Sequence, residues 1–126
     1  MKMGDPSKPE ELRARTKKFA LRIIRLFRSL PRATEAQILG RQVLRSGTSV
    51  AANYRAVCRA RSRPEFISKF GTVVEEADET VFWLELLVDA KIVPDGRLQP
   101  LLIEASELLA IFAASQRTAK SPPQNQ

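Results

Sequence analysis

Two rows of basic side chains are the residues of this sequence best suited to chemistry. Within each row the spacing puts the cations on one face of a helix, and neither row contains an acidic residue. Arginine and lysine bind phosphate oxygens without reading bases. The rows are therefore candidate nucleic-acid-binding surfaces, or else solvated faces whose long stems cover apolar neighbours. Their members are Arg15, Lys18, Arg22 and Arg25 in the first row, and Arg41, Arg45, Arg55 and Arg59 in the second.

Catalysis and metal binding lack their usual side chains in this chain. The sequence has no histidine, the commonest general base and transition-metal ligand. Glu75, Glu76, Asp78 and Glu79 could in principle hold a hard cation, but a solvated or salt-bridged helix face accounts for them better. No glycine loop of the phosphate-cradling kind follows a strand. We therefore expect a non-enzymatic protein with no catalytic residue, no metal and no cofactor.

Two single polar residues have less specific interpretations. Cys58 has no second cysteine to pair with and no histidine to activate it, so we expect a buried, inert side chain in a reducing cytoplasm. Asn53 lies at the edge of a predicted core face. We expect its amide to hydrogen bond across a helix interface and fix the register, with a ligand or nucleic-acid contact as the alternative.

Four stretches with apolar residues at three- and four-residue steps predict the helices that position these side chains. Serine or threonine followed three residues later by glutamate or glutamine predicts capping boxes that start at Ser7, Thr34 and Ser62. The expected helices cover about residues 7–29, 34–61, 63–90 and 96–119, the last beginning between 96 and 100. Short connections make successive helices antiparallel neighbours. We predict one all-α domain over residues 1–126, an up-down-up-down four-helix bundle with disordered ends at about 1–6 and 121–126.

The apolar stripes predict which residues form the core and which large apolar residues lie outside it. Gly40 and Gly47 lie beside the second stripe, where they would allow close approach of a neighbouring helix. Phe82, Trp83 and Leu86 lie off the third stripe, so a single bundle would leave them largely exposed and they predict an oligomer interface. The predicted core residues are Leu12, Thr16, Phe19, Ile23, Leu26, Leu30, Leu39, Val43, Val50, Tyr54, Val57, Phe66, Phe70, Val73, Val74, Ala77, Val81, Leu84, Val88, Leu98, Leu101, Leu102, Ala105, Leu108, Leu109 and Phe112.

Charge is divided unevenly between the two halves of the chain. Residues 1–63 carry 16 basic and 4 acidic side chains, whereas residues 64–126 carry 5 and 10, within a net charge of +7. Such asymmetry can attract nucleic acid to the basic half. It can equally pair basic and acidic surfaces of neighbouring subunits. Because the first two helices are expected to be neighbours, their basic rows could merge into one strip.

Residues 46–93 contain four sequence segments that resemble those of a known family. They are S-V-x-A-N at 49–53, a basic stretch at 55–63, S-x-x-E-F at 62–66 and W-L-E-L-L at 83–87. In these segments the chain resembles the bacterial four-helix-bundle proteins encoded within intervening sequences of large-subunit ribosomal RNA genes, over about residues 19–119. Many relatives have Ala-Glu-Gly soon after the asparagine, where this chain has Tyr54-Arg55-Ala56. No role of that glutamate is therefore carried over.

The resemblance implies a homo-oligomer, with five-fold rings among the relatives. It extends to the accessory variability determinant proteins of diversity-generating retroelements, which are basic rings that partner a reverse transcriptase and nucleic acid. We thus expect a cytoplasmic, non-enzymatic accessory protein that binds RNA or DNA without sequence specificity. The alternative is a protein-interaction scaffold whose basic and acidic faces pair between subunits. We expect no membrane partner, since the start of the chain is polar and no apolar run approaches about 18 residues.

Overall fold

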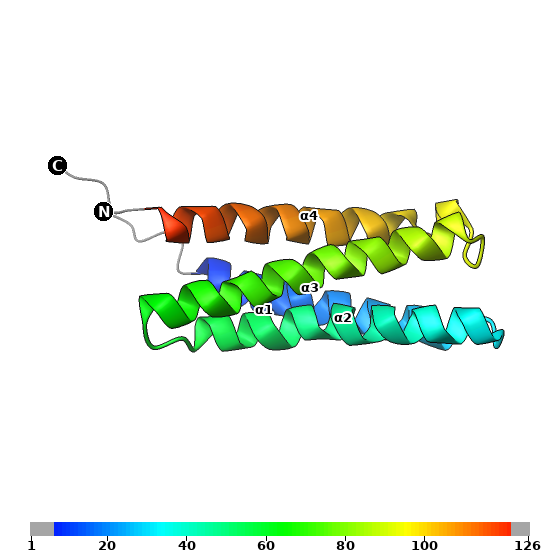
Figure 1. The fold of residues 1–126 in the computed structure, drawn as a ribbon, viewed down its shortest axis with the longest axis horizontal. Coiled ribbons are helices and arrows are strands. Elements are labelled where there is room, and N and C mark those ends of the chain that lie inside the picture. The colour runs from blue at the N-terminus through cyan, green and yellow to red at the C-terminus, as the bar shows by residue number, and fades with distance from the viewer. Residues whose placement is uncertain (1–6, 122–126) are drawn as a thin grey trace.

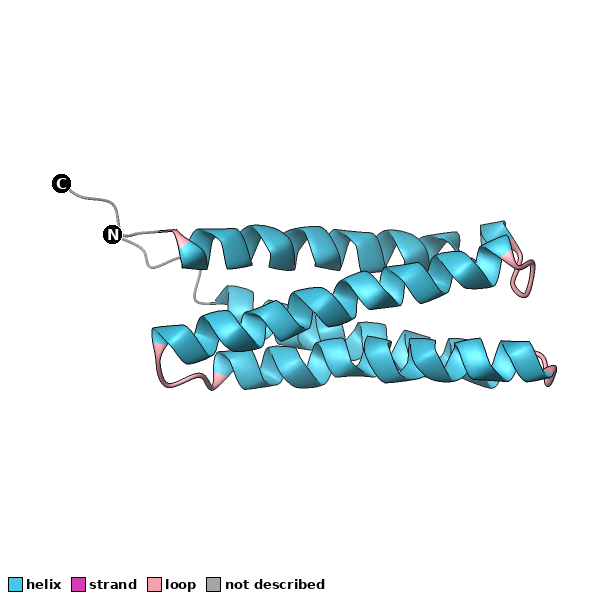
Figure 2. Cartoon of the chain, in the orientation of Figure 1, coloured by secondary structure: helices cyan, strands magenta, loops and turns pink. Residues whose placement is uncertain are grey.

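The computed structural model describes residues 7–121, which form four α-helices and no strand. The helices are α1 (Ser7–Arg28), α2 (Thr34–Cys58), α3 (Arg63–Asp89) and α4 (Asp95–Lys120). Each runs antiparallel to the one before it, with short loops between them (Figures 1 and 2). The predicted all-α, up-down-up-down bundle is confirmed. The disorder predicted at residues 1–6 and 121–126 lies outside the described residues except at Ser121, whose amide caps α4 by bonding the Arg117 and Thr118 carbonyls.

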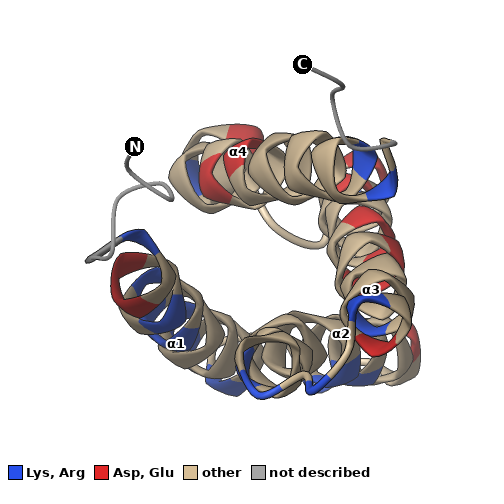
Figure 3. Ribbon diagram, turned by 90° about the vertical axis from the view of Figure 1, so that its left-hand side faces the viewer, with Lys and Arg blue, Asp and Glu red and all other residues tan. Residues whose placement is uncertain are grey.

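The helices follow one another around the bundle axis, as the view along that axis shows (Figure 3). α2 packs against α1 and α3, and α3 also packs against α4. α1 and α4, the first and last elements, make the fewest contacts of any neighbouring pair. The junction of α1 with α4 therefore has the least packing to hold it together.

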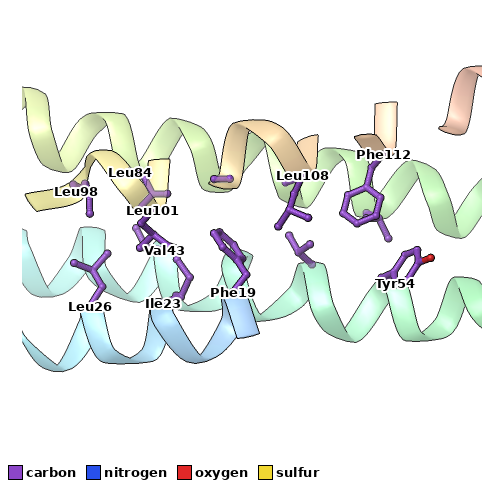
Figure 4. Packing of buried hydrophobic residues seen from close by; sticks show 14 of the residues in the cluster. Phe19, Ile23, Leu26, Val43, Tyr54, Leu84, Leu98, Leu101, Leu108 and Phe112 are labelled. Atoms are coloured by element: carbon purple, nitrogen blue, oxygen red, sulfur yellow. The ribbon is translucent and has the colours of Figure 1, made fainter. Parts of the chain in front are cut away.

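The core is built from the apolar stripes of all four helices (Figure 4). Every residue predicted for the α1 stripe is buried, and Phe19, Ile23, Leu84 and Phe112 are at most 2% exposed. The sequence missed Leu87, which is fully buried on α3. Several predicted core residues prove only half-buried and pack around the edge of the core. They are Leu39, Phe66, Val74, Val81, Val88, Leu102 and Leu109.

At Gly40 and Gly47, side chains from α1 and the turn after it pack closely against α2, as the predicted close approach requires. A Cβ atom at Gly47 would lie 2.8 Å from Cγ1 of Ile23, and one at Gly40 would lie 2.5 Å from Cδ1 of Leu30. Real Cβ atoms do not tolerate contacts this short. The two glycines therefore let Ile23 of α1 and Leu30, just after α1, pack directly against the α2 backbone.

The predicted helix caps are confirmed only in part. Ser62 Oγ accepts a hydrogen bond from the Glu65 amide at 3.2 Å, but the Glu65 carboxylate accepts from the amide of Arg61 instead of Ser62. The box at Thr34 is wrong, because Ala33 is the cap residue and Thr34 is already helical. Gln37 instead donates from Nε2 to the Pro31 carbonyl. The Ser7 side chain lies outside the described part.

α4 is long and apolar enough to cross a membrane by length and composition alone, which the sequence did not lead us to expect. One such helix among the described residues is weak support for a membrane span. The helix carries Glu104 and Glu107, and both bind Arg15 of α1. Carboxylates at mid-helix are costly in lipid. The ion pairs therefore identify α4 as a member of the bundle.

Candidate nucleic-acid interface

The two basic rows face different neighbours and do not merge into one strip. On α1, Arg15 binds carboxylates of α4, while Arg22 and Arg25 line a pocket together with residues of α4. On α2, Arg45 binds carboxylates of α3, whereas Arg55 lines a groove with residues of α1. The prediction of a single strip was wrong because the α1 row turns toward α4 and away from α2.

Arg15 is neutralised inside the chain. Its Nε lies 2.7 Å from Oε2 of Glu104 and its Nη2 lies 2.8 Å from Oε1 of the same residue. A third bond of 2.8 Å joins Nη2 to Oε1 of Glu107. The hydrogen bond with Arg15 lowers the pKa of Glu104, and the same bond raises the pKa of Arg15. A guanidinium with three carboxylate bonds is not available to bind phosphate.

Arg45 is compensated in the same way by the acidic face of α3. Nη1 of Arg45 lies 3.2 Å from Oε1 of Glu76, and Nη2 binds Glu79. Glu79 also accepts a 3.0 Å hydrogen bond from the indole Nε1 of Trp83. Two of the eight predicted binding residues, Arg15 and Arg45, thus hold helices of one chain together.

A groove of about 670 Å³ between α1 and α2 gathers three cations that have no such partners. Arg13 and Lys17 reach it from α1, and Arg55 reaches it from α2. Within the described chain, none of these three has a carboxylate within 4.0 Å. The other residues lining the groove are Glu10, Ala14, Thr48, Ala51 and Ala52, which are small apart from the glutamate.

Sequence reasoning missed Arg13 and Lys17. They are one turn apart, so they share a face of α1, but it is not the face of the predicted row. Their four-residue spacing was the available signal. Of the other predicted residues, Arg22 is half-buried, and those that are exposed are Lys18, Arg25, Arg41, Arg55 and Arg59. Viewed along the axis, the basic residues lie mostly on α1 and α2, with some on α3 and α4, and the acidic ones lie mainly on α3 and α4 (Figure 3).

Asn53 does not bond across the helix interface as predicted. Its Nδ2 donates to the carbonyl and the hydroxyl of Ser49, one turn back in α2, at 2.9 and 2.8 Å. Asn53 is half-buried and turned toward its own helix. The buried polar contact between helices is instead that of Thr80 Oγ1 with Ser46 Oγ, at 2.9 Å. Sequence reasoning missed this pair because Ser46 and Thr80 were not counted among the core residues. In the structure each hydroxyl also bonds a carbonyl of the preceding turn, so the side chain can be buried in a helical core.

Cys58 is exposed, so the prediction of a buried thiol was wrong. It is the last residue of α2, where the core stripe ends at Val57. No second cysteine and no histidine accompany it in the sequence. In the described part of the chain, no group of three or more carboxylate or thiol side chains could hold a metal ion.

Of the residues predicted for an oligomer interface, Phe82 is the most exposed, at 52%. Its ring packs edge-on against Trp83, with the centroids 5.0 Å apart. Trp83 and Leu86 are half-buried, and Trp83 also packs against the core. Of Phe82, Trp83 and Leu86, Phe82 is thus the side chain with the most apolar surface left for a partner to bury.

Comparisons with known proteins give a consistent match. A sequence model of the 23S rRNA-intervening sequence protein family matches residues 10–114. Among solved structures, a protein of unknown function from the S23 ribosomal protein family of Bacteroides thetaiotaomicron is similar, with a TM-score of 0.80 and 30% sequence identity. The similarity covers 87% of this chain and 98% of that one. No curated protein is similar enough to count as a match.

Proposed function

The chain belongs to the 23S rRNA-intervening sequence protein family, as the resemblance indicated, and we propose that it binds nucleic acid without sequence specificity through the groove between α1 and α2. No enzymatic class is attached to the family or to the similar structure. In this proposal the protein is a non-enzymatic, cytoplasmic accessory protein that acts as a homo-oligomer. A five-fold ring is the assembly that the resemblance implies.

The groove is the observation that carries the proposal. Arg13, Lys17 and Arg55 come from two helices and have no carboxylate within ion-pair distance among the described residues. Glu10 is the one carboxylate among the lining residues, so the groove has more cations than anions. Cations in excess repel one another and lower stability. Their placement is explained by an anionic partner that supplies the missing charge.

The lining of the groove favours a nucleic-acid backbone over exposed bases. Thr48, Ala51 and Ala52 on α2 are small, so a phosphate chain can approach the helix while the longer cations reach it from the sides. None of the residues that line the groove is aromatic. Stacking on aromatic rings is the usual way to hold single-stranded bases. We therefore expect phosphate contacts, with duplex or structured nucleic acid as the partner.

Other support comes from exposed cations and from the names of the relatives. Arg41 on α2 and Arg59, the residue directly after α2, are exposed and would add further contacts. The names of the matched family and of the similar structure refer to ribosomal RNA and to a ribosomal protein family. RNA is therefore the first probe to use, with DNA of the same length beside it.

The test is to measure binding to labelled RNA and DNA duplexes by fluorescence anisotropy at a series of salt concentrations. Changing Arg13, Lys17 and Arg55 together to glutamine should weaken binding equally for all sequences. Because each phosphate contact contributes a log–log salt slope of about −0.9 on duplex DNA, the triple change should flatten the slope by about 2 to 3. The matched control changes Lys69, Arg117 and Lys120 to glutamine. These changes remove the same amount of positive charge, but from α3 and α4. An intact parent oligomer that shows no binding at about 50 mM salt would overturn the proposal.

The scaffold alternative has one observation in its favour. The outer face of α3 keeps four exposed carboxylates that bind no cation within the described chain: Glu75, Asp78, Glu85 and Asp89. These could pair with the basic groove of a neighbouring subunit. In that case the triple variant would dissociate at low salt, which sedimentation velocity would detect. Loss of nucleic-acid binding with the assembly intact would instead favour the proposed function.

A further inference from the structure

A second basic pocket lies at the other end of α1, where this helix meets the first turns of α4. Its volume is about 260 Å³. Arg22 and Arg25 line it from α1, Ser29 from the turn after α1, and Arg97 from α4. The apolar and proline residues around it are Leu26, Leu98, Pro100 and Leu101. This pocket belongs to a different pair of helices from the groove that carries the proposed function.

Three arginines from two helices line this pocket, and no carboxylate lines it with them. In the described residues none of Arg22, Arg25 and Arg97 has a carboxylate within 4.0 Å. Glu104, further along α4, already has both oxygens bonded to Arg15. The hydroxyl of Ser29 donates to the Leu26 carbonyl at 2.7 Å. The free hydrogen-bond donors of the pocket are therefore the arginines.

The wall of the pocket strengthens their charge. Leu26, Leu98 and Leu101 are at most 8% exposed and form an apolar base beneath the arginines. Pro100 has no amide hydrogen, so it donates no backbone hydrogen bond to water or ligand in the pocket. Charges beside a low-dielectric wall interact more strongly than charges in water. Three such cations are costly to the free protein and attractive to a multivalent anion.

We propose that Arg22, Arg25 and Arg97 form a binding site for a single phosphate group carried as a phosphomonoester or as free phosphate. Arginine matches the oxygens of phosphate with paired N–H donors. A dianion offsets three cations better than the one charge of a backbone phosphodiester does. The pocket is also much smaller than the α1–α2 groove, which suits one group better than a continuous strand. The source of the phosphate is then either the end of a nucleic acid or a small molecule.

Calorimetry and thermal unfolding with inorganic phosphate, against chloride at equal ionic strength, test the chemistry. Phosphate should raise the melting temperature of the parent protein. Arg97→Gln and Arg22→Gln should each weaken phosphate binding by about 10-fold, as loss of one charge-assisted hydrogen bond would. Arg117→Gln removes the same charge from the far end of α4 and should keep the full effect. An equal response of all three variants and the parent would overturn the proposal.

Two oligonucleotides of one sequence, with and without a 5′-phosphate, identify the source. Tighter binding of the phosphorylated form that disappears in Arg97→Gln would assign the site to nucleic-acid ends. A phosphate response without that preference would assign it to free phosphate. The glutamine variant of Arg13, Lys17 and Arg55 should lose both oligonucleotides but keep the response to phosphate. Failure of the groove proposal therefore leaves this one standing, and the reverse is also true.

Discussion

Arg15 and Arg13 lie two residues apart on α1, yet they have opposite surroundings. Arg15 has three hydrogen bonds to two carboxylates of α4, while Arg13 lines a groove among other cations. The ion pairs of Arg15 cross the α1–α4 junction, where the fewest contacts hold the bundle together. We infer that Arg15 serves the stability of this junction and that Arg13 serves binding.

This role of Arg15 predicts how stability depends on pH. Because Arg15 lowers the pKa of Glu104 in the folded chain, the pair stabilises the protein above the unfolded pKa of about 4.3. That contribution is lost as the pH falls from about 5 through the lowered folded value. Glu104→Gln should therefore cost roughly 1 kcal/mol at pH 7, in the range of a partly exposed ion pair. The deficit should shrink in acid.

Urea denaturation between pH 7 and pH 3 measures both quantities. Glu107→Gln is the matched control, because Glu107 makes only one bond to Arg15 and its side chain is 59% exposed. The control should lose less stability and keep the acid dependence of the parent. A deficit of Glu104→Gln that stays constant down to pH 3 would contradict the role assigned to the pair.

At the scale of the helices, Gly47 sets how closely α2 approaches α1. Gly47→Ala should gain about 1 kcal/mol of helix propensity, but the new methyl group would meet the stiff, fully buried Ile23 at 2.8 Å. Overpacking of this kind costs about 1–3 kcal/mol, so we expect a net loss of stability. Gly71→Ala is the control. Its nearest atom is Nε2 of the flexible Gln116, 3.1 Å away, and a gain is expected. Thermal unfolding of the two variants decides, and a stabilised Gly47→Ala would refute the close approach.

Helix period was enough to predict the fold, because burial follows the spacing of apolar residues. The α1 stripe from Leu12 to Leu30 is an example, since each of its residues is buried. The spacing could not reveal Thr80, whose hydroxyl is satisfied inside the core by the Glu76 carbonyl at 2.7 Å. It did locate the start of α2 at residue 34, but not the capping residue, which is Ala33 and not Thr34.

The candidate site was less predictable than the fold, because a sequence shows which residues share a face but not which neighbour that face meets. Arg15, Arg22 and Arg25 do share a face of α1, yet this face lies toward α4. Arg13 and Lys17 face α2 and were overlooked. The direction of a face depends on how the bundle closes. That in turn depends on the long-range packing of all four stripes.

At the scale of the whole molecule, the basic groove and Phe82 lie on different helices. The groove with Arg13, Lys17 and Arg55 involves α1 and α2, whereas Phe82 and the exposed carboxylates lie on α3. An assembly that covers the outer side of α3 would therefore leave the basic groove open. Repeated grooves on one oligomer would raise avidity for a long polyanion without any new contact. Self-association and nucleic-acid binding are thus compatible in one particle.

Phe82 offers the most direct test of that assembly. Phe82→Ala with Leu86→Ala should yield a smaller species by sedimentation velocity and leave the helical circular dichroism signal unchanged, because Phe82 is 52% exposed and Leu86 is half-buried. Trp83 is left in place, since it packs on the core and donates to Glu79, so its removal would also destabilise the fold. Leu21→Ala is the control, a comparably exposed apolar residue on α1. An unchanged oligomer in the double variant would place the interface elsewhere. A specific interface concentrates its binding energy in a few residues. If Leu21→Ala also gave a smaller species, assembly would depend on exposed apolar surface in general and not on the predicted interface.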